Sequence, residues 1–180
     1  PAIENRVPYI ITGASSHLVT RRGFLPTDHS LYIDDEAGMS YMFHYCTTTY
    51  HYSETVAHFF AESMKPLLAS EYGITRNLRL AVLYRDDAFG KGVWDATNHF
   101  IEADNLPIEV VAEVKYPVSA TTFQAELQTV KANNPDAVYL VDFTTNTATI
   151  YRQGQSNVGL NSVYIAVEAC EEPEFYSALE

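Results

Sequence analysis

The stretch at residues 78–92, LRLAVLYRDDAFGKG, most constrains how this chain can fold. LRLAVLY is mostly apolar, which is typical of a strand buried on both faces of a parallel sheet. RDDAFGKG reads as a polar turn with glycines, and apolar residues recur at helical spacing from Phe89 to Ile101. Strand, tight turn and helix open a βαβ unit. Because ligands of open α/β sheets bind beyond the carboxyl ends of the strands, the turn at 85–92 is expected to border a ligand site.

The same alternation continues along the rest of the chain. Apolar segments of strand length are separated by amphipathic segments of helix length. We expect strands at 78–84, 109–116, 137–143 and 163–167, and helices at 89–103, 123–132, 146–156 and from 171 onward. This alternation predicts an α/β fold with a doubly wound parallel sheet. The hydroxyl side chains of SATT are expected to cap the helix at 123–132.

The segment before this alternation reads less regularly. An alternating strand is expected at 40–45. A long helix is expected to be capped by Tyr52 or Ser53 and to run to about residue 72. Pro66 lies inside that helix and is expected to kink or restart it.

Length and charge narrow the function classes. The chain has 180 residues and is 47% hydrophobic, which suffices for the core of one domain. Its net charge of −12 argues against nucleic acid and anionic membrane surfaces as partners. No run is long and apolar enough to span a bilayer. The sequence starts without a signal peptide and reads as a piece of a longer precursor.

Two acidic residues follow apolar strands, Asp142 in VDF and Glu168 in VEAC. Since both strands are expected to be parallel, both carboxylates would face one crevice. Each can pair with a ligand cation or bond to neighbouring backbone amides. Phe89 and Phe143 are expected at the same edge, either as walls of a ligand cleft or as core residues.

A short apolar strand at 7–11 ends in the turn TGASSH. The Ser15 hydroxyl is placed to contact a ligand beside the backbone of Gly13 and Ala14, or else to cap the next turn. The nucleophile motif GxSxG is absent, so this turn does not indicate an enzyme. The phosphate-binding motifs GxxxxGK[ST] and GxGxxG are absent too, and no cofactor is expected.

Histidines and cysteines near residue 46 invite a metal hypothesis. His44, Cys46 and His51 match no familiar zinc spacing, and no metal site is expected from them. Cys46 and Cys170 are the two cysteines of the chain. The sequence leaves open whether they form a disulfide or remain thiols, although a structural staple is not expected.

Several sequence segments resemble those of one known family. They are DDAFGKG, FQAELQTVKANNPDAVYL, RQGQSNVGL and VPYIITGASS. Their order and spacing resemble the type I periplasmic binding proteins, in the branched-chain amino-acid branch of ABC transporter substrate-binding proteins, which includes Leu/Ile/Val-binding proteins. FHYCTTTYHY resembles the crossing between the two lobes of that family, but departs from its usual Phe-Arg-Thr pattern.

The resemblance implies a two-lobed protein with the ligand held between α/β lobes. On this interpretation residues 1–46 are the incomplete end of the first lobe together with the lobe crossing. Residues 47–180 are a nearly complete second ligand-binding lobe. The chain is then a fragment of the two-lobe fold.

The resemblance also implies ligand-binding roles by position. Gly13 and Ala14 would hold the charged backbone groups of the ligand through their main chain, and Ser15 through its hydroxyl. Glu168 would pair with the ligand ammonium. Phe89 and Phe143 would take aromatic cleft positions that often carry tyrosine in the family. Asp142 stands at a position where the family often has a small residue.

The function implied is the extracellular solute-binding component of an ABC transporter, a binding protein rather than an enzyme. It would capture an amino acid or related amine and deliver it to a membrane permease. Its place would be periplasmic or extracellular, with a membrane anchor as an option for the full-length precursor. The alternatives are a ligand-sensing receptor domain of the same fold and, less favoured, a small α/β hydrolase. Self-association of the fragment is also considered, through the apolar strand at 7–11.

Overall fold

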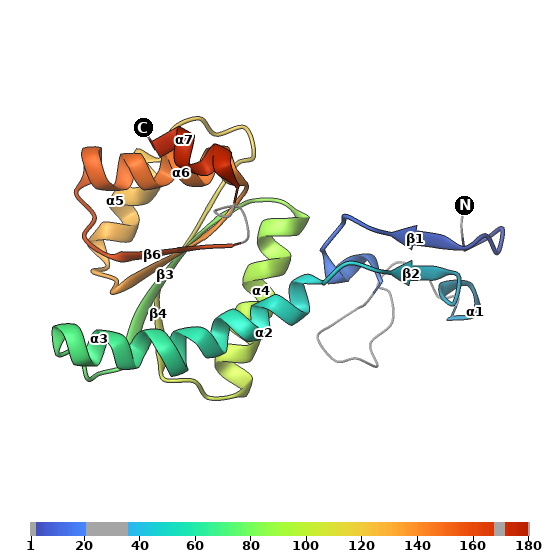
Figure 1. Ribbon diagram of the computed structural model, residues 1–180, viewed down its shortest axis with the longest axis horizontal. Coiled ribbons are helices and arrows are strands. Elements are labelled where there is room, and N and C mark those ends of the chain that lie inside the picture. Colours follow the sequence, from blue (N-terminus) through green and yellow to red (C-terminus); the bar gives the residue numbers. More distant parts are fainter. Residues whose placement is uncertain (1–2, 21–35, 168–171, 180) are drawn as a thin grey trace.

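A parallel sheet with the strand order β4–β3–β5–β6 forms the centre of the larger part of the chain. The structure is a computed structural model that describes residues 3–20, 36–167 and 172–179. The predicted residues Glu168 and Cys170 therefore lie outside the described residues. Figure 1 shows helices on both sides of this sheet and a smaller sheet that projects from it.

The strands of the central sheet follow the apolar segments of the sequence. They are β3 Leu78–Arg85, β4 Ile108–Tyr116, β5 Ala137–Val141 and β6 Val163–Ala166. All pairings among them are parallel. Every residue of β5 is buried, and β3 is buried except for its two arginines. The predicted parallel sheet is confirmed.

Alternate residues of β3 face two separate hydrophobic cores, because side chains of a strand point to opposite faces in turn. Leu80 and Val82 join one core with α2 Thr49–Phe59 and α4 Ala88–Ala103. Leu83 joins the other core. That second core includes residues of α5 Gln124–Ala132 and α6 Thr144–Gln153. The doubly wound architecture predicted from the sequence is therefore present.

The long helix begins earlier than expected. Its N-cap is Thr48, so the prediction of a cap at Tyr52 or Ser53 is wrong. Ser53 is buried and its hydroxyl donates to the Val93 carbonyl oxygen at 3.1 Å. This side chain thus packs against α4 and does not cap the helix.

Pro66 interrupts the long helix without ending it. A π-helical turn, η2 Phe60–Met64, precedes α3 Lys65–Tyr72, in which Pro66 lies in the first turn. Proline is tolerated in the first turn of a helix because its missing N–H would have no partner there. The predicted restart at Pro66 is confirmed.

Two other helix ends differ from expectation. The helix α5 has Phe123 as its N-cap and no side-chain cap, so the prediction of a cap by SATT is wrong. The Phe123 amide instead donates to Gln153 Oε1 at 2.8 Å. The helix α6 begins at Thr144, two residues early, and continues into the π-helical turn η3 Gly154–Val158. A final helix, α7 Pro173–Leu179, packs against α6.

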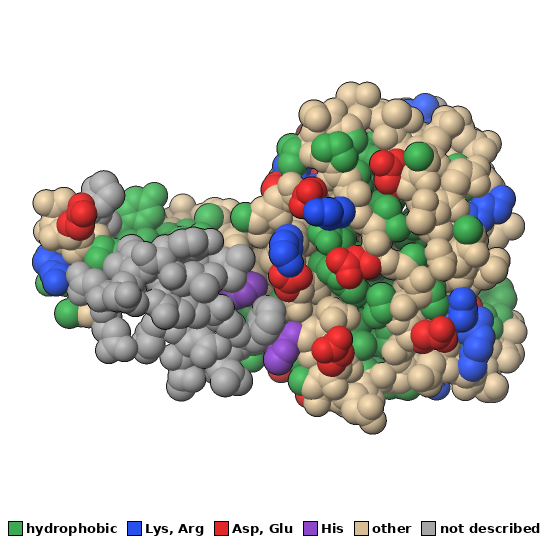
Figure 2. Space-filling model, turned by 180° about the vertical axis from the view of Figure 1, so that it is seen from behind, with side chains coloured by type: hydrophobic (Ala, Val, Ile, Leu, Met, Phe, Trp, Pro, Cys, Tyr) green, Lys and Arg blue, Asp and Glu red, His purple; other side chains and the backbone are tan. Residues whose placement is uncertain are grey.

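The smaller sheet pairs β1 Tyr9–Ile11 with β2 Met42–His44 in parallel. Both strands are shorter than predicted. A 3₁₀ turn, η1 His17–Val19, follows β1, and α1 Glu36–Met39 precedes β2. Ile10 is 61% exposed and Phe43 51%. Hydrophobic side chains are visible on the projecting part in Figure 2.

The link between β2 and α2 runs through residues 45–48 and contains the predicted boundary between residues 46 and 47. That boundary stays a prediction. Within the described ranges, no helix is long and apolar enough to cross a membrane.

Candidate functional site

The turn after β1 is bonded to the start of α2. The Thr49 amide donates to the Ser15 carbonyl oxygen at 2.7 Å. The Tyr52 hydroxyl donates to Ser15 Oγ at 3.4 Å. Gly13 and Ala14 are exposed in this turn, and Ser15 is partly buried. The predicted turn residues are therefore held in place by the first helix of the larger part of the chain.

The carbonyl group of Ala14 is bonded to residues at the end of β2. His44 Nε2 donates to the Ala14 carbonyl oxygen at 2.6 Å, and the Cys46 thiol lies 3.4 Å from the same oxygen. His44 Nδ1 lies 3.2 Å from Thr20 Oγ1. Because this carbonyl is occupied, the turn offers a ligand its amide groups and the Ser15 hydroxyl.

A buried histidine joins the turn to α2. His17 is 1% exposed, and its amide donates to Thr49 Oγ1 at 3.1 Å. Its Nδ1 atom lies 2.6 Å from the same Oγ1. A Cβ on Gly92 of α4 would lie 3.7 Å from Ser16 Oγ, so the turn also lies against α4. Sequence reasoning missed His17 and Thr49, whose link spans 32 positions of the chain.

The turn after β3 is organised by Asp87. Its Oδ1 atom accepts from the amides of Phe89 and Gly90, at 3.1 Å and 2.9 Å, and so caps α4. Arg85 Nε donates to Asp87 Oδ2 at 2.7 Å. A Cβ on Gly90 would lie 2.1 Å from the Arg85 carbonyl oxygen, which explains why glycine stands there.

Asp142 is the centre of a hydrogen-bond network at the carboxyl ends of the strands. It is 1% exposed. Its Oδ1 atom accepts from Arg85 Nη1 at 2.9 Å and from the Phe143 amide at 2.6 Å. Its Oδ2 atom accepts from the Tyr116 hydroxyl at 2.7 Å and from Asn146 Nδ2 at 2.8 Å. Of the two roles that the sequence left open, bonding to neighbouring groups is the one the geometry favours.

The network affects the ionisation of its members. Burial, and then the hydrogen bond to Asp142, raise the pKa of Tyr116 far above its usual range. Burial alone would lower the pKa of Arg85, but the hydrogen bonds and charges of Asp142 and Asp87 together outweigh this and raise the pKa. The Arg85 guanidinium is therefore charged and the Tyr116 phenol is neutral at physiological pH.

Phe89 and Phe143 lie together at this edge of the sheet, as predicted. Their rings are stacked with centroids 5.0 Å apart and planes 11° apart. Phe143 is 50% exposed. Arg85 Cζ lies 4.6 Å from the centroid of the Phe143 ring, within the range of a cation–π contact. The pair thus presents aromatic surface beside a fixed guanidinium.

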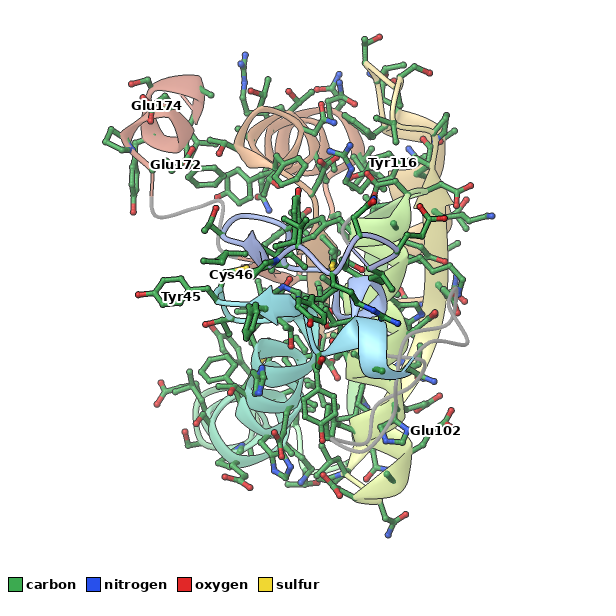
Figure 3. All side chains as sticks on the ribbon, turned by 90° about the vertical axis from the view of Figure 1, so that its right-hand side faces the viewer. Tyr45, Cys46, Glu102, Tyr116, Glu172 and Glu174 are labelled. Carbon is green, nitrogen blue, oxygen red and sulfur yellow. The ribbon has the colours of Figure 1, made fainter. Side chains whose placement is uncertain are left out.

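The geometry does not support a metal site at His44, Cys46 and His51. Among the described residues, no group of three or more His, Cys, Asp and Glu side chains could hold a metal ion. His51 bonds to Thr48 Oγ1 at 3.0 Å instead of joining His44 and Cys46. Cys46 is a free thiol. Its neighbour Tyr45 is 84% exposed and points away from the body of the molecule (Figure 3).

Comparison with known families decides what these elements belong to. Residues 4–174 match the family model for periplasmic binding proteins. The chain belongs to the periplasmic binding protein family. No curated protein matches the chain at the level of sequence.

Solved structures of type I periplasmic binding proteins share this fold. A leucine binding protein from Thermotoga maritima is 17% identical, with 99% of this chain and 42% of that chain covered and a TM-score of 0.68. A branched-chain amino acid ABC transporter protein from Thermus thermophilus with bound valine is 12% identical, with 99% and 39% covered and a TM-score of 0.72. A solute binding protein from R. palustris in complex with benzoate is 14% identical, with 98% and 41% covered and a TM-score of 0.71.

This periplasmic binding protein chain thus spans about two fifths of the length of these structures, 39–42%. At such low identity the likeness concerns the fold. The family and the α/β architecture expected from the sequence phrases are confirmed. The roles of the individual site residues stay predictions.

Proposed function

We propose that the chain is part of the solute-binding component of an ABC transporter, outside the cytoplasmic membrane, that captures a small amino-acid-like or amine-bearing ligand between two lobes. It would hand this ligand to a membrane permease. Membership of the periplasmic binding protein family and the fold shared with solute-binding structures support this. The protein binds and releases its ligand unchanged.

The observation that carries the proposal is the position of the Ser15 turn. It is bonded to Thr49 and Tyr52 of α2 and lies beside Gly92 of α4. Gly92 lies about one helical turn from Phe89, and the Phe89 ring stacks on the ring of Phe143. Backbone amides and a hydroxyl are therefore brought near an apolar wall, the combination typical of small-molecule sites.

In this proposal the ligand is bound from both sides. The amides of Gly13 and Ala14 and the Ser15 hydroxyl bind its polar backbone groups, while Phe89 and Phe143 contact its apolar part. Glu168 pairs with its ammonium group, because an ionised carboxylate in a closed cleft needs a compensating charge. Asp142 acts indirectly, since its oxygens are occupied by Arg85, Tyr116 and their neighbours.

A hydrolase would need a nucleophile next to a general base. The contact of Ser15 Oγ within the described residues is with the Tyr52 hydroxyl, and not with a histidine. This arrangement favours binding over catalysis.

Calorimetric titration of the full-length protein tests the proposal. The panel comprises L-valine, L-leucine, L-glutamine and benzoate. Saturable binding of at least one amino acid is expected, together with a decrease in the radius of gyration when the lobes close. If no member of the panel binds and the scattering profile does not change, the proposal is wrong.

A further inference from the structure

Arg85 holds an unusual position at the proposed site. Its guanidinium is bonded through Nε to Asp87 Oδ2 and through Nη1 to Asp142 Oδ1. The side chain is 13% exposed. Held by two carboxylates, it lies over the half-exposed ring of Phe143. A cation of the protein itself thus occupies the aromatic surface where a ligand cation would bind.

Both carboxylates beside Arg85 already accept hydrogen bonds from groups of the protein, and the Asp142 side chain is 0% exposed. Asp142 accepts four hydrogen bonds, and its residue is buried. Asp87 accepts from two amides of α4 through Oδ1 and from Arg85 through Oδ2. A ligand cation brought to Phe143 would therefore meet the guanidinium first and would lose its own hydration without a replacement.

We infer that Arg85 is a specificity-determining residue that excludes positively charged ligand groups from the aromatic pair Phe89–Phe143. The part of the ligand that contacts this pair is then apolar. This inference rests on the proposed function, because it concerns the same ligand. It adds that amino acids with basic side chains are rejected, because a fixed guanidinium already occupies the aromatic surface and the hydrogen bonds of the carboxylates beside it.

The stacked geometry supports an apolar contact. The two rings are nearly parallel and Phe143 leaves half of its surface exposed. Exposed aromatic carbon gains free energy by contact with apolar groups of a ligand. The charge of Arg85, in contrast, is already compensated by Asp87 and Asp142. The edge is thus prepared for apolar contact and not for a second ion pair.

Norleucine and lysine are the matched probes for this inference, because their side chains differ mainly by the terminal ammonium group. Both are titrated calorimetrically into the full-length protein, its Arg85→Gln variant and its Arg85→Lys variant. Arg76→Gln is the control, because Arg76 precedes the amino end of β3 and pairs with Asp136. Thermal unfolding followed by circular dichroism establishes that each variant is folded.

The parent protein is expected to bind norleucine with an affinity at least about tenfold higher than its affinity for lysine. Arg85→Gln should reduce this ratio about tenfold, since a ligand ammonium can then take the place of the guanidinium. Arg85→Lys and Arg76→Gln should keep the parental ratio. If Arg85→Gln does not fold, equal binding of the two probes by the parent still overturns the inference.

Two results overturn the inference: equal binding of lysine and norleucine by the parent, or an unchanged ratio in folded Arg85→Gln. Failure of the proposed function looks different. In that case the parent binds neither probe and no other amino acid of the panel, and the inference is lost with the function.

Discussion

Arg85 and Asp142 face each other across the carboxyl ends of two neighbouring strands, with Arg85 Nη1 at 2.9 Å from Asp142 Oδ1. β3 and β5 pair so that Tyr84 lies beside Val141, and the next residue along each strand supplies one partner of the ion pair. The side chains are 13% and 0% exposed, respectively. Separating them therefore costs more than separating a surface pair.

Asp142→Asn should lower the free energy of unfolding by about 3 kcal/mol, because it removes the buried one of the two carboxylates that pair with the Arg85 guanidinium. Asparagine keeps the shape of the side chain but also turns one acceptor into a donor facing donors. Urea unfolding followed by circular dichroism measures the loss.

Asp95→Asn is the control for this prediction. Asp95 pairs with Lys91 on the surface of α4, where the two side chains are 39% and 60% exposed. Its loss should cost less than about 1 kcal/mol. Equal losses in both variants would show that burial of the Arg85–Asp142 pair is unimportant.

Two glycines of α4 should respond in opposite ways to alanine. Gly90→Ala would place a Cβ 2.1 Å from the Arg85 carbonyl oxygen, so the chain must shift, at a cost of about 2 kcal/mol. At Gly92 the nearest atom would lie 3.7 Å away, and alanine is the better helix former. Gly92→Ala should keep or raise the melting temperature. A melting temperature of Gly90→Ala at the parental value would contradict this prediction.

The sequence predicted the sheet because the signal of a doubly buried strand is local. LRLAVLY and AVYLV need no information beyond their own apolar residues. The turn at 85–92 could be placed at the ligand edge for the same reason. Phe89 and Phe143 could be placed at the same edge because each follows a parallel strand.

The rest depended on partners that are distant in the sequence. Arg85 and Asp142 are 57 positions apart, and no local pattern says which acid a given arginine meets. Ser53 has the residue type of a cap, but contact with Val93 decides its role. The amide of Phe123, the N-cap residue of α5, donates to Gln153, 30 positions away. Tertiary packing overrode local preference in each case.

Ser15→Ala should weaken binding of the ligand by about 1 kcal/mol, or roughly fivefold, through loss of one hydrogen bond. Titration of the full-length variant with a ligand of the parent measures this. Ser70→Ala is the matched control, because its hydroxyl donates to the Leu67 carbonyl oxygen on the exposed part of α3. An affinity of Ser15→Ala equal to that of Ser70→Ala would remove the serine from the site.

His58 should make a small pH-dependent contribution to stability. Hydrogen bonds to Glu62 and then Asp104 raise its pKa above the ordinary value of 6.5. The pKa of His58 is higher in the folded than in the unfolded protein. The stabilisation is therefore complete below the unfolded pKa and is lost as the pH rises through the folded pKa. His58→Gln should therefore lower the melting temperature in acid and leave it unchanged in alkali. A loss independent of pH would contradict this.

The exposed apolar residues of β1 and β2 should make the 180-residue chain associate when it is produced alone. Both faces of this small sheet carry exposed hydrophobic side chains, including Tyr9 and Ile10 at 55% and 61%. Within the described residues, β1 pairs on one edge only, with β2, and a free apolar edge invites pairing with another chain. Light scattering at increasing protein concentration should show a rising mean mass.

A charge placed on β1 should reverse this association. Ile10→Lys puts an ammonium group on the exposed strand β1. Association with a second chain at this strand would have to desolvate the ammonium group. Leu67→Lys is the control, because Leu67 is similarly exposed at 57% but lies on α3, away from the small sheet. Ile10→Lys should be monomeric at concentrations where the parent chain and Leu67→Lys associate. A parent chain that stays monomeric throughout, or equal association of both variants, would show that β1 is not the contact.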